Sequence, residues 1–247
     1  TWRAGFDGDA FVLWEQMRRA SPVPLGLFYD AGDHQVLAST MERFLSWRPD
    51  GDGRGPLLTR PIKGTIARRG QDAEERSALH QDPKERAEHV MIVDLMRNDL
   101  GRVAEIGSVE VVDALSVEPF AKLHHLVSTV RCETRAGTAM SDVLRATFPP
   151  GSVTGAPKVR AVQLIEELEP EPRGIYCGAV GYIDGGSGEL SLAVAIRVAM
   201  VGEGEVVYRA GGGLVEASDP DREVAETELK ARAFLEACAA LPDGRRI

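Results

Sequence analysis

Four glutamates occur in two pairs, and each pair has the three-residue spacing that brings two side chains to one face of a helix. Glu85 and Glu88 form the first pair, and Glu223 and Glu226 form the second. If the pairs face each other, their carboxylates repel unless a hard divalent cation lies between them, and Mg2+ with partial water ligation fits best. The spacing therefore predicts a magnesium site. Each pair alone also fits a solvated first helical turn.

A lysine near the end of an apolar segment is the second chemical feature. The residues at 57–65 indicate extended backbone up to Pro61 and a turn at Gly64. Pro61 fixes its own φ and Gly64 permits angles closed to other residues, so Lys63 is presented in one place. The alternative is an ordinary solvated lysine. We favour a functional amine because the acidic pairs follow along the same chain.

Positive groups beside glycine-rich turns favour an anionic ligand. Arg197 interrupts an apolar strand pattern, and a buried arginine needs an anionic partner. The glycine-rich segment 151–157 leads into a helix whose free N–H groups suit an anion, and Lys158 adds a charge there. Lys230 shares the stripe of the second glutamate pair, and the glycines at 211–213 let a ligand approach the backbone. These features predict a small polycarboxylate as ligand.

Composition narrows the classes of partner and compartment. The chain has 247 residues and a net charge of −9, which argues against nucleic acid as a main partner. Its apolar runs are shorter than a membrane span, and its first residues do not resemble a signal peptide. The chain has three cysteines, Cys132, Cys177 and Cys238. Their odd number and the absence of metal-ligand spacing favour a reducing, cytoplasmic location.

Helical periodicity and cap residues predict helices at 10–20, 82–101 and 141–148, and two more that begin near residues 157 and 220. In the last two we expect packing through two apolar sets, which are Val159, Val162, Leu164 and Ile165, and Val224, Leu229, Ala233 and Leu235. The segment 68–81 is predicted to be a mobile loop or a solvated helix, and we assign it no chemistry.

Apolar alternation predicts the strands, beginning with a hairpin formed by residues 25–30 and 34–40. Two short strands at 108–112 and 115–118 precede a strand at 124–134, and three antiparallel strands follow at 177–184, 190–201 and 205–215. We expect one domain over residues 1–247. Because Thr1 is not a natural start, we also expect an upstream segment to be missing.

The chain resembles the chorismate-utilising enzymes over nearly its whole length. The motifs that carry the resemblance are MERFL (41–45), TRPIKGT (59–65), KERAEHVMIVDLMRNDLGRV (84–103), VEPFAKLHHLVSTV (117–130), FPPGSVTGAPKVRA (148–161), CGAVGY (177–182), AIRVA (195–199), AGGG (210–213) and AETELKAR (225–232). It implies an α+β fold, an α/β sandwich with two large, mainly antiparallel sheets and helices outside.

The resemblance also implies roles for individual residues. Glu88 and Glu226 would ligate Mg2+, with Glu85 and Glu223 acting directly or through water. Glu42 would be the general acid, which requires that burial raise its pKa. The substrate carboxylates would be held by Arg197, Tyr182, Lys230, Gly212 and Gly213. Further positions tied to the site are His125, which we expect to be catalytic, and Arg97, Arg102, Ser108 and Thr154.

Lys63 distinguishes between members of this family. The resemblance places lysine here in aminodeoxychorismate synthases and a small residue in most anthranilate synthases. It implies attack of the neutral amine on C2 of chorismate as the C4 hydroxyl leaves. Ammonia from a glutamine amidotransferase partner would then give 4-amino-4-deoxychorismate for para-aminobenzoate and folate biosynthesis. The alternatives are an anthranilate or isochorismate synthase of the same fold, and a non-catalytic chorismate-binding relative.

Overall fold

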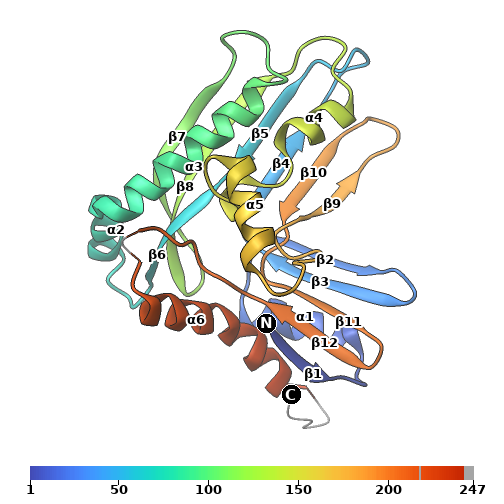
Figure 1. Ribbon diagram of the computed structural model, residues 1–247, viewed down its shortest axis with the longest axis vertical. Helices are drawn as coiled ribbons and strands as arrows, with labels where there is room; N and C mark the ends of the chain where they lie inside the picture. The colour runs from blue at the N-terminus through green and yellow to red at the C-terminus, as the bar shows by residue number, and fades with distance from the viewer. Residues whose placement is uncertain (217, 242–247) are drawn as a thin grey trace. The chain divides into compact units, whose positions relative to one another are not determined.

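A computed structural model describes residues 1–216 and 218–241, and the chain divides into two compact units. Unit 1 comprises Thr1–Met41 and the residues from Ala195 onward, and unit 2 comprises Glu42–Val194. Each unit has its own antiparallel sheet and its own helices (Figure 1). This arrangement confirms the predicted α+β class with two mainly antiparallel sheets. The prediction of a single domain over 1–247 stays a prediction.

Unit 1 is built on a five-stranded sheet in the order β1-β12-β11-β3-β2. Its strands are β1 (Trp2–Gly5), β2 (Leu25–Asp30), β3 (His34–Thr40), β11 (Val198–Gly202) and β12 (Glu205–Arg209). Its helices are α1 (Ala10–Ala20) and α6 (Pro220–Ala239), which pack against each other. The β2–β3 hairpin confirms the prediction for residues 25–40, and Asp219 caps α6 through its side chain.

The core of unit 1 is centred on two stacked rings. Tyr208 of β12 and Phe234 of α6 are parallel, with ring centroids 4.2 Å apart, and both are buried. The predicted packing face of α6 was wrong, since its buried residues are Ala231, Phe234, Ala237 and Cys238, whereas Val224, Leu229 and Leu235 are exposed. The small alanine and cysteine side chains let α6 approach the rest of unit 1 closely. The prediction looked for large apolar residues and therefore chose the wrong face of the helix.

Unit 2 holds a seven-stranded sheet in the order β6-β8-β5-β4-β10-β9, with β7 also paired to β8. Its strands are β4 (Arg43–Trp47), β5 (Pro56–Arg60), β6 (Ile62–Ala67), β7 (Glu110–Pro119), β8 (Leu123–Glu133), β9 (Ala179–Ile183) and β10 (Leu190–Val194). Its helices are α2 (Asp72–Gln81), α3 (Pro83–Gly101), α4 (Met140–Thr147), the 3-10 helix η1 (Gly151–Val153) and α5 (Lys158–Leu168).

Strands β5 and β6 behave as one extended segment interrupted at Pro61, since both pair with β8, β5 at residues 130–133 and β6 at residues 123–127. Helix α3 packs on β6 and β8. It begins as predicted, with the Asp82 carboxylate accepting from the N–H groups of Lys84 and Glu85. Its buried His89 joins Ser128 of β8 through Nε2 and Oγ, 2.7 Å apart, which fixes the helix on the sheet.

Three strand predictions needed correction, and the first is the strand expected at 205–215, since β12 ends at Arg209. The two short strands expected at 108–118 are one strand, β7, whose register shifts near Leu115, a residue with φ of 54°. The strand expected at 190–201 is broken into β10 and β11, which belong to different sheets, and Arg197 at the break has φ of 51°. Apolar alternation continues across both irregularities, so it could not reveal them.

Two helix predictions also needed correction. The segment 68–81 contains the regular helix α2, with Glu75 and Leu79 buried. In α5 every residue keeps some exposure, and Val159 and Leu164 are exposed. Across the described residues, all helices are too short or too polar to cross a membrane.

Phe234→Ala tests whether the stacked rings stabilise unit 1. Removing a buried phenylalanine leaves a cavity and costs about 3–5 kcal/mol of unfolding free energy. Leu235→Ala is the matched control, because Leu235 is 41% exposed. Its truncation should cost less than about 1 kcal/mol. Chemical denaturation followed by near-UV circular dichroism measures both, and equal losses would contradict this description of the core.

Candidate active site

Lys63 and Glu88 form the central contact of the candidate site in unit 2. The Nζ of Lys63 lies 2.9 Å from Oε1 of Glu88. Their side chains are only 19% and 16% exposed, so little water screens the pair. Lys63 comes from β6 and Glu88 from α3, so the packing of that helix on that strand positions both groups. The lysine is therefore not the solvated surface residue of the alternative reading.

A β-bulge at Gly64 determines which way the lysine faces. Lys63 pairs with Leu126 and Thr65 with His125, so the register shifts by one residue between them. Gly64 has φ of +80°, and a Cβ there would lie 2.9 Å from Leu126 Cδ1 and 3.3 Å from Glu85 Oε2. The predicted turn at Gly64 was wrong, because β6 continues to Ala67. The glycine instead leaves room beside the Glu85 carboxylate.

Glu42 is a buried acid immediately before β4. The residue is only 4% exposed to solvent, and its backbone carbonyl oxygen accepts a hydrogen bond from the Val194 N–H at 3.0 Å. Burial raises the pKa of its carboxyl to about 7, against the opposing effects of a hydrogen bond with Ser152 and the positive charge of Lys63. Glu42 therefore holds a proton near neutral pH. Ser152 was not among the predicted site residues, because the sequence marks it only as a hydroxyl in the glycine-rich segment 151–157.

His125 holds the strand that carries the lysine. Its Nδ1 lies 3.0 Å from Oγ1 of Thr65 and 3.2 Å from the carbonyl oxygen of Gly64, and its ring meets Phe120 edge-on. Because neighbours along a strand face opposite sides of a sheet, His125 and Leu126 point in opposite directions. Lys63 is paired with Leu126, so the histidine contacts the bulge from its other side.

The second glutamate pair lies in unit 1, on α6. Nζ of Lys230 lies 2.6 Å from Oε1 of Glu226 and donates to the Gly211 carbonyl oxygen at 2.9 Å. Oε1 of Glu223 accepts from Ser218 Oγ at 2.7 Å, and a Cβ on Gly212 would lie 2.9 Å from Glu223 Oε2. The absence of a side chain at Gly212 thus leaves room at this carboxylate, as Gly64 does at Glu85.

Arg197 is only partly buried, and it serves the backbone of unit 1. Its Nη1 donates to the Lys230 carbonyl oxygen at 2.7 Å. This contact is to a neutral carbonyl oxygen of α6, and the predicted role of Arg197 in holding a carboxylate stays a prediction. Gly213, predicted to bind substrate through its backbone, is exposed in the same loop as Gly212.

The acidic groups of each unit offer the hard oxygen ligands that Mg2+ prefers. Glu85 and Glu88 in unit 2, and Glu223 and Glu226 in unit 1, supply hard carboxylate oxygens. In each unit one carboxylate is held by a lysine, and the other faces the space left by a glycine. The residues present therefore suit the ion, and the convergence of the four carboxylates stays a prediction.

The remaining predicted residues of unit 2 make local contacts. Arg97 is exposed and pairs with Asp94, Arg102 donates to the Ala146 carbonyl, and Tyr182 is 58% exposed. Two hydroxyls cap backbone: Ser108 donates to the carbonyls of Glu105 and Glu133, and Thr154 to those of Pro150 and Gly151. None of these contacts joins them to Lys63, and their roles in a site stay predictions.

Lys158 does not offer a free charge at the start of α5. Its ammonium is bound by the buried Asp99 carboxylate and by the Thr147 carbonyl oxygen. Burial raises the pKa of Asp99, against the hydrogen bond from Lys158. The pair joins α3 to the start of α5. The charge of Lys158 is therefore already paired with Asp99 and does not add to the predicted anion site.

Two names recur among the curated relatives of this chain. It is 44% identical over 235 residues to the aminodeoxychorismate synthase component 1 of Klebsiella aerogenes, covering 94% of this chain and 51% of that protein. It is 43% identical over 240 residues to the anthranilate synthase component 1 of Aquifex aeolicus, covering 96% and 47%. The chain thus spans about half the length of the curated relatives it matches.

A solved structure and a family profile give the same result. The crystal structure of anthranilate synthase component I from Streptococcus pneumoniae matches with a TM-score of 0.83 and 37% identity, covering 94% of this chain and 51% of that one. The menaquinone-specific isochorismate synthase MenF of Escherichia coli shares the fold, with a TM-score of 0.80 and 24% identity over 95% and 53% of the two chains. The profile of the chorismate binding enzymes matches residues 1–236, and this chain belongs to that family.

Proposed function

We propose that the protein aminates chorismate to 4-amino-4-deoxychorismate, in a Mg2+-dependent reaction with Lys63 as nucleophile. The observation that carries the proposal is the position of Lys63, whose amine is largely buried and held 2.9 Å from Glu88. The names of two relatives, at 44% and 40% identity, support the same reaction. Both are named component 1, which supports a second component, and we propose a glutamine amidotransferase that supplies ammonia.

The proposed reaction begins at the Lys63 amine. Its nitrogen forms a bond to C2 of chorismate while the C4–O bond breaks, and the hydroxyl leaves as water with the proton of Glu42. Ammonia then adds at C4 and loses a proton, which returns to the Glu42 carboxylate, while the bond between C2 and the lysine nitrogen breaks and the free amine is restored. Water is therefore exchanged for ammonia overall, and no oxidant or reductant is needed.

Glu88 has two roles in the proposed reaction. In the structure it pairs with Lys63 and holds the amine in one position. Mg2+ bound at the same carboxylate would supply charge to orient the substrate and would compete for Glu88. Arg60, the last residue of β5, is bound by Glu118 and Thr129.

The second candidate is an anthranilate synthase, and a specific observation favours it. The Aquifex aeolicus enzyme of that name is 43% identical to this chain, nearly the same as the first relative. Both reactions start from chorismate and ammonia, so the product decides between them. A chorismate-binding protein without turnover would return chorismate unchanged.

Lys63→Ala tests the nucleophile. Amination by the full-length protein with chorismate, Mg2+ and an ammonium salt should fall roughly a thousandfold or more, because the covalent route is lost. Chromatography of the products measures the effect. Lys84→Ala is the control, since Lys84 is exposed one turn before Glu88 on the same helix. Unchanged amination in a folded Lys63→Ala variant would exclude the covalent route.

The pH dependence of turnover tests Glu42. The protonated carboxyl is the donor, so turnover should fall as pH rises through about 7. Glu42→Gln keeps the shape of the side chain but removes its acidic proton, so turnover should fall roughly 100- to 10,000-fold.

Stability gives an independent check on the same residue. A pKa raised from 4.5 to about 7 means that the folded state favours the neutral acid. Its stabilising effect is complete below pH 4.5 and is lost as pH rises through about 7. Glu42→Gln should therefore gain stability relative to the wild type over this range, as measured by denaturation at several pH values. A difference that does not change with pH would contradict the raised pKa.

A further inference from the structure

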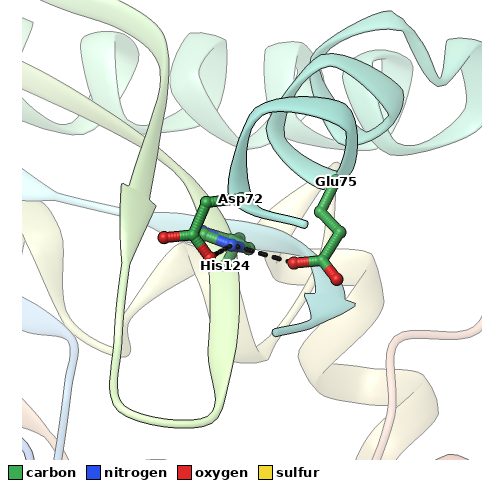
Figure 2. Close-up of side chains that lie close together, drawn as sticks. All are labelled: Asp72, Glu75 and His124. Atoms are coloured by element: carbon green, nitrogen blue, oxygen red, sulfur yellow. Dashed lines mark ion pairs between the residues drawn. The ribbon is translucent and has the colours of Figure 1, made fainter. Parts of the chain in front are cut away.

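We propose that Asp72, Glu75 and His124 bind a divalent transition-metal ion, and that Zn2+ matches the site best. The three side chains converge in Figure 2, with the carboxylates coming from α2 and the imidazole from β8. One ligand atom of each lies within 4.8 Å of the other two. This cluster is separate from the two glutamate pairs, and the proposal does not depend on the proposed reaction.

The distances fit an ion better than a hydrogen bond. Nε2 of His124 lies 3.4 Å from Oδ1 of Asp72 and 3.4 Å from Oε2 of Glu75. A hydrogen bond between nitrogen and oxygen would measure about 2.7–3.2 Å. A tetrahedral Zn2+ ion with bonds of about 2.0–2.1 Å places neighbouring ligand atoms about 3.3–3.4 Å apart. The observed separations are therefore those of two edges of a zinc coordination shell.

Burial of the imidazole is the second, independent observation. The side chain of His124 is 0% exposed, and within the described residues neither ring nitrogen has a hydrogen-bond partner. Oε2 of the buried Glu75 also lacks one there, and it is the oxygen that faces the ring. Native proteins rarely leave such buried groups unsatisfied. An ion held between Nε2 and Oε2 would satisfy both.

The surroundings hold the two carboxylates in a ligating orientation. The Arg69 N–H donates to Oε1 of Glu75 at 2.8 Å, which leaves Oε2 turned to the ring. Arg68 donates to both oxygens of Asp72, at 2.9 and 2.8 Å. Hydrogen bonds to ligating carboxylates are usual in metal sites. The Asp72 side chain is 44% exposed, so an ion has a path from solvent.

The ligand types select the metal. One imidazole nitrogen with two carboxylate oxygens suits Zn2+, whereas Mg2+ prefers oxygen ligands alone. Three protein ligands leave a fourth position for water. The ion would join α2 to β8, at a residue that pairs with Ile66 of the strand carrying Lys63. We infer that it stabilises this part of unit 2.

Zinc binding by the full-length protein tests the proposal. After treatment with a chelator, titration calorimetry with Zn2+ should give one bound ion per chain, which excess Mg2+ does not displace, and the melting temperature should rise. Glu75→Gln and His124→Gln should weaken binding roughly tenfold or more. The matched controls are Glu74→Gln and His80→Gln, exposed residues of α2, which should bind as the wild type does.

Co2+ absorption provides a readout that requires no variant. The wild-type protein with Co2+ should show the visible bands of a tetrahedral ion, and Zn2+ should abolish them. Failure of the wild type to bind either ion would overturn the proposal and leave a buried imidazole beside two carboxylates. Equal binding by Glu75→Gln and Glu74→Gln would also overturn it, because the ion would then lie elsewhere.

Discussion

The ion pair between Lys63 and Glu88 is the contact on which the candidate site depends. Each side chain is more than four-fifths buried, so either charge alone would be costly. The pair therefore requires that β6 and α3 be held in one arrangement. Two features meet this requirement: the bulge at Gly64, which turns Lys63 towards the helix, and the contact of His89 with Ser128, which fixes the helix on β8. The position of the Lys63 amine thus depends both on the bulge in β6 and on the packing of α3 against the sheet.

Glu42 adds a buried acid to the same unit. Its burial favours the neutral acid, and this effect outweighs both Ser152 and the charge of Lys63. One unit of the fold thus supplies a proton donor that works near neutral pH and an amine paired with a carboxylate. Groups whose environments separate their protonation states are typical of acid–base chemistry in enzymes. Membership of the chorismate binding enzymes supports chorismate as the proposed substrate, and the buried amine of Lys63 supports the proposed reaction.

The sequence predicted the elements with strong local signals. The cap at Asp82 and the hairpin at residues 25–40 depend on neighbours in the chain, so residue type and spacing were sufficient. The bulge at Gly64 and the break at Arg197 depend on which strands pair, and local alternation carries no such information. The cluster around His124 was missed for a similar reason. Its acidic pair has the same three-residue spacing as the glutamate pairs, but the histidine is distant in sequence.

Mass spectrometry of Lys63 after exposure to chorismate tests the central claim most directly. The full-length protein would be incubated with chorismate and Mg2+ in the absence of ammonia, quenched with acid and digested. We predict that the peptide containing Lys63 gains the mass of chorismate less one water. An unmodified Lys63, in protein that still forms 4-amino-4-deoxychorismate when ammonium is added, would contradict the claim that this amine is the nucleophile.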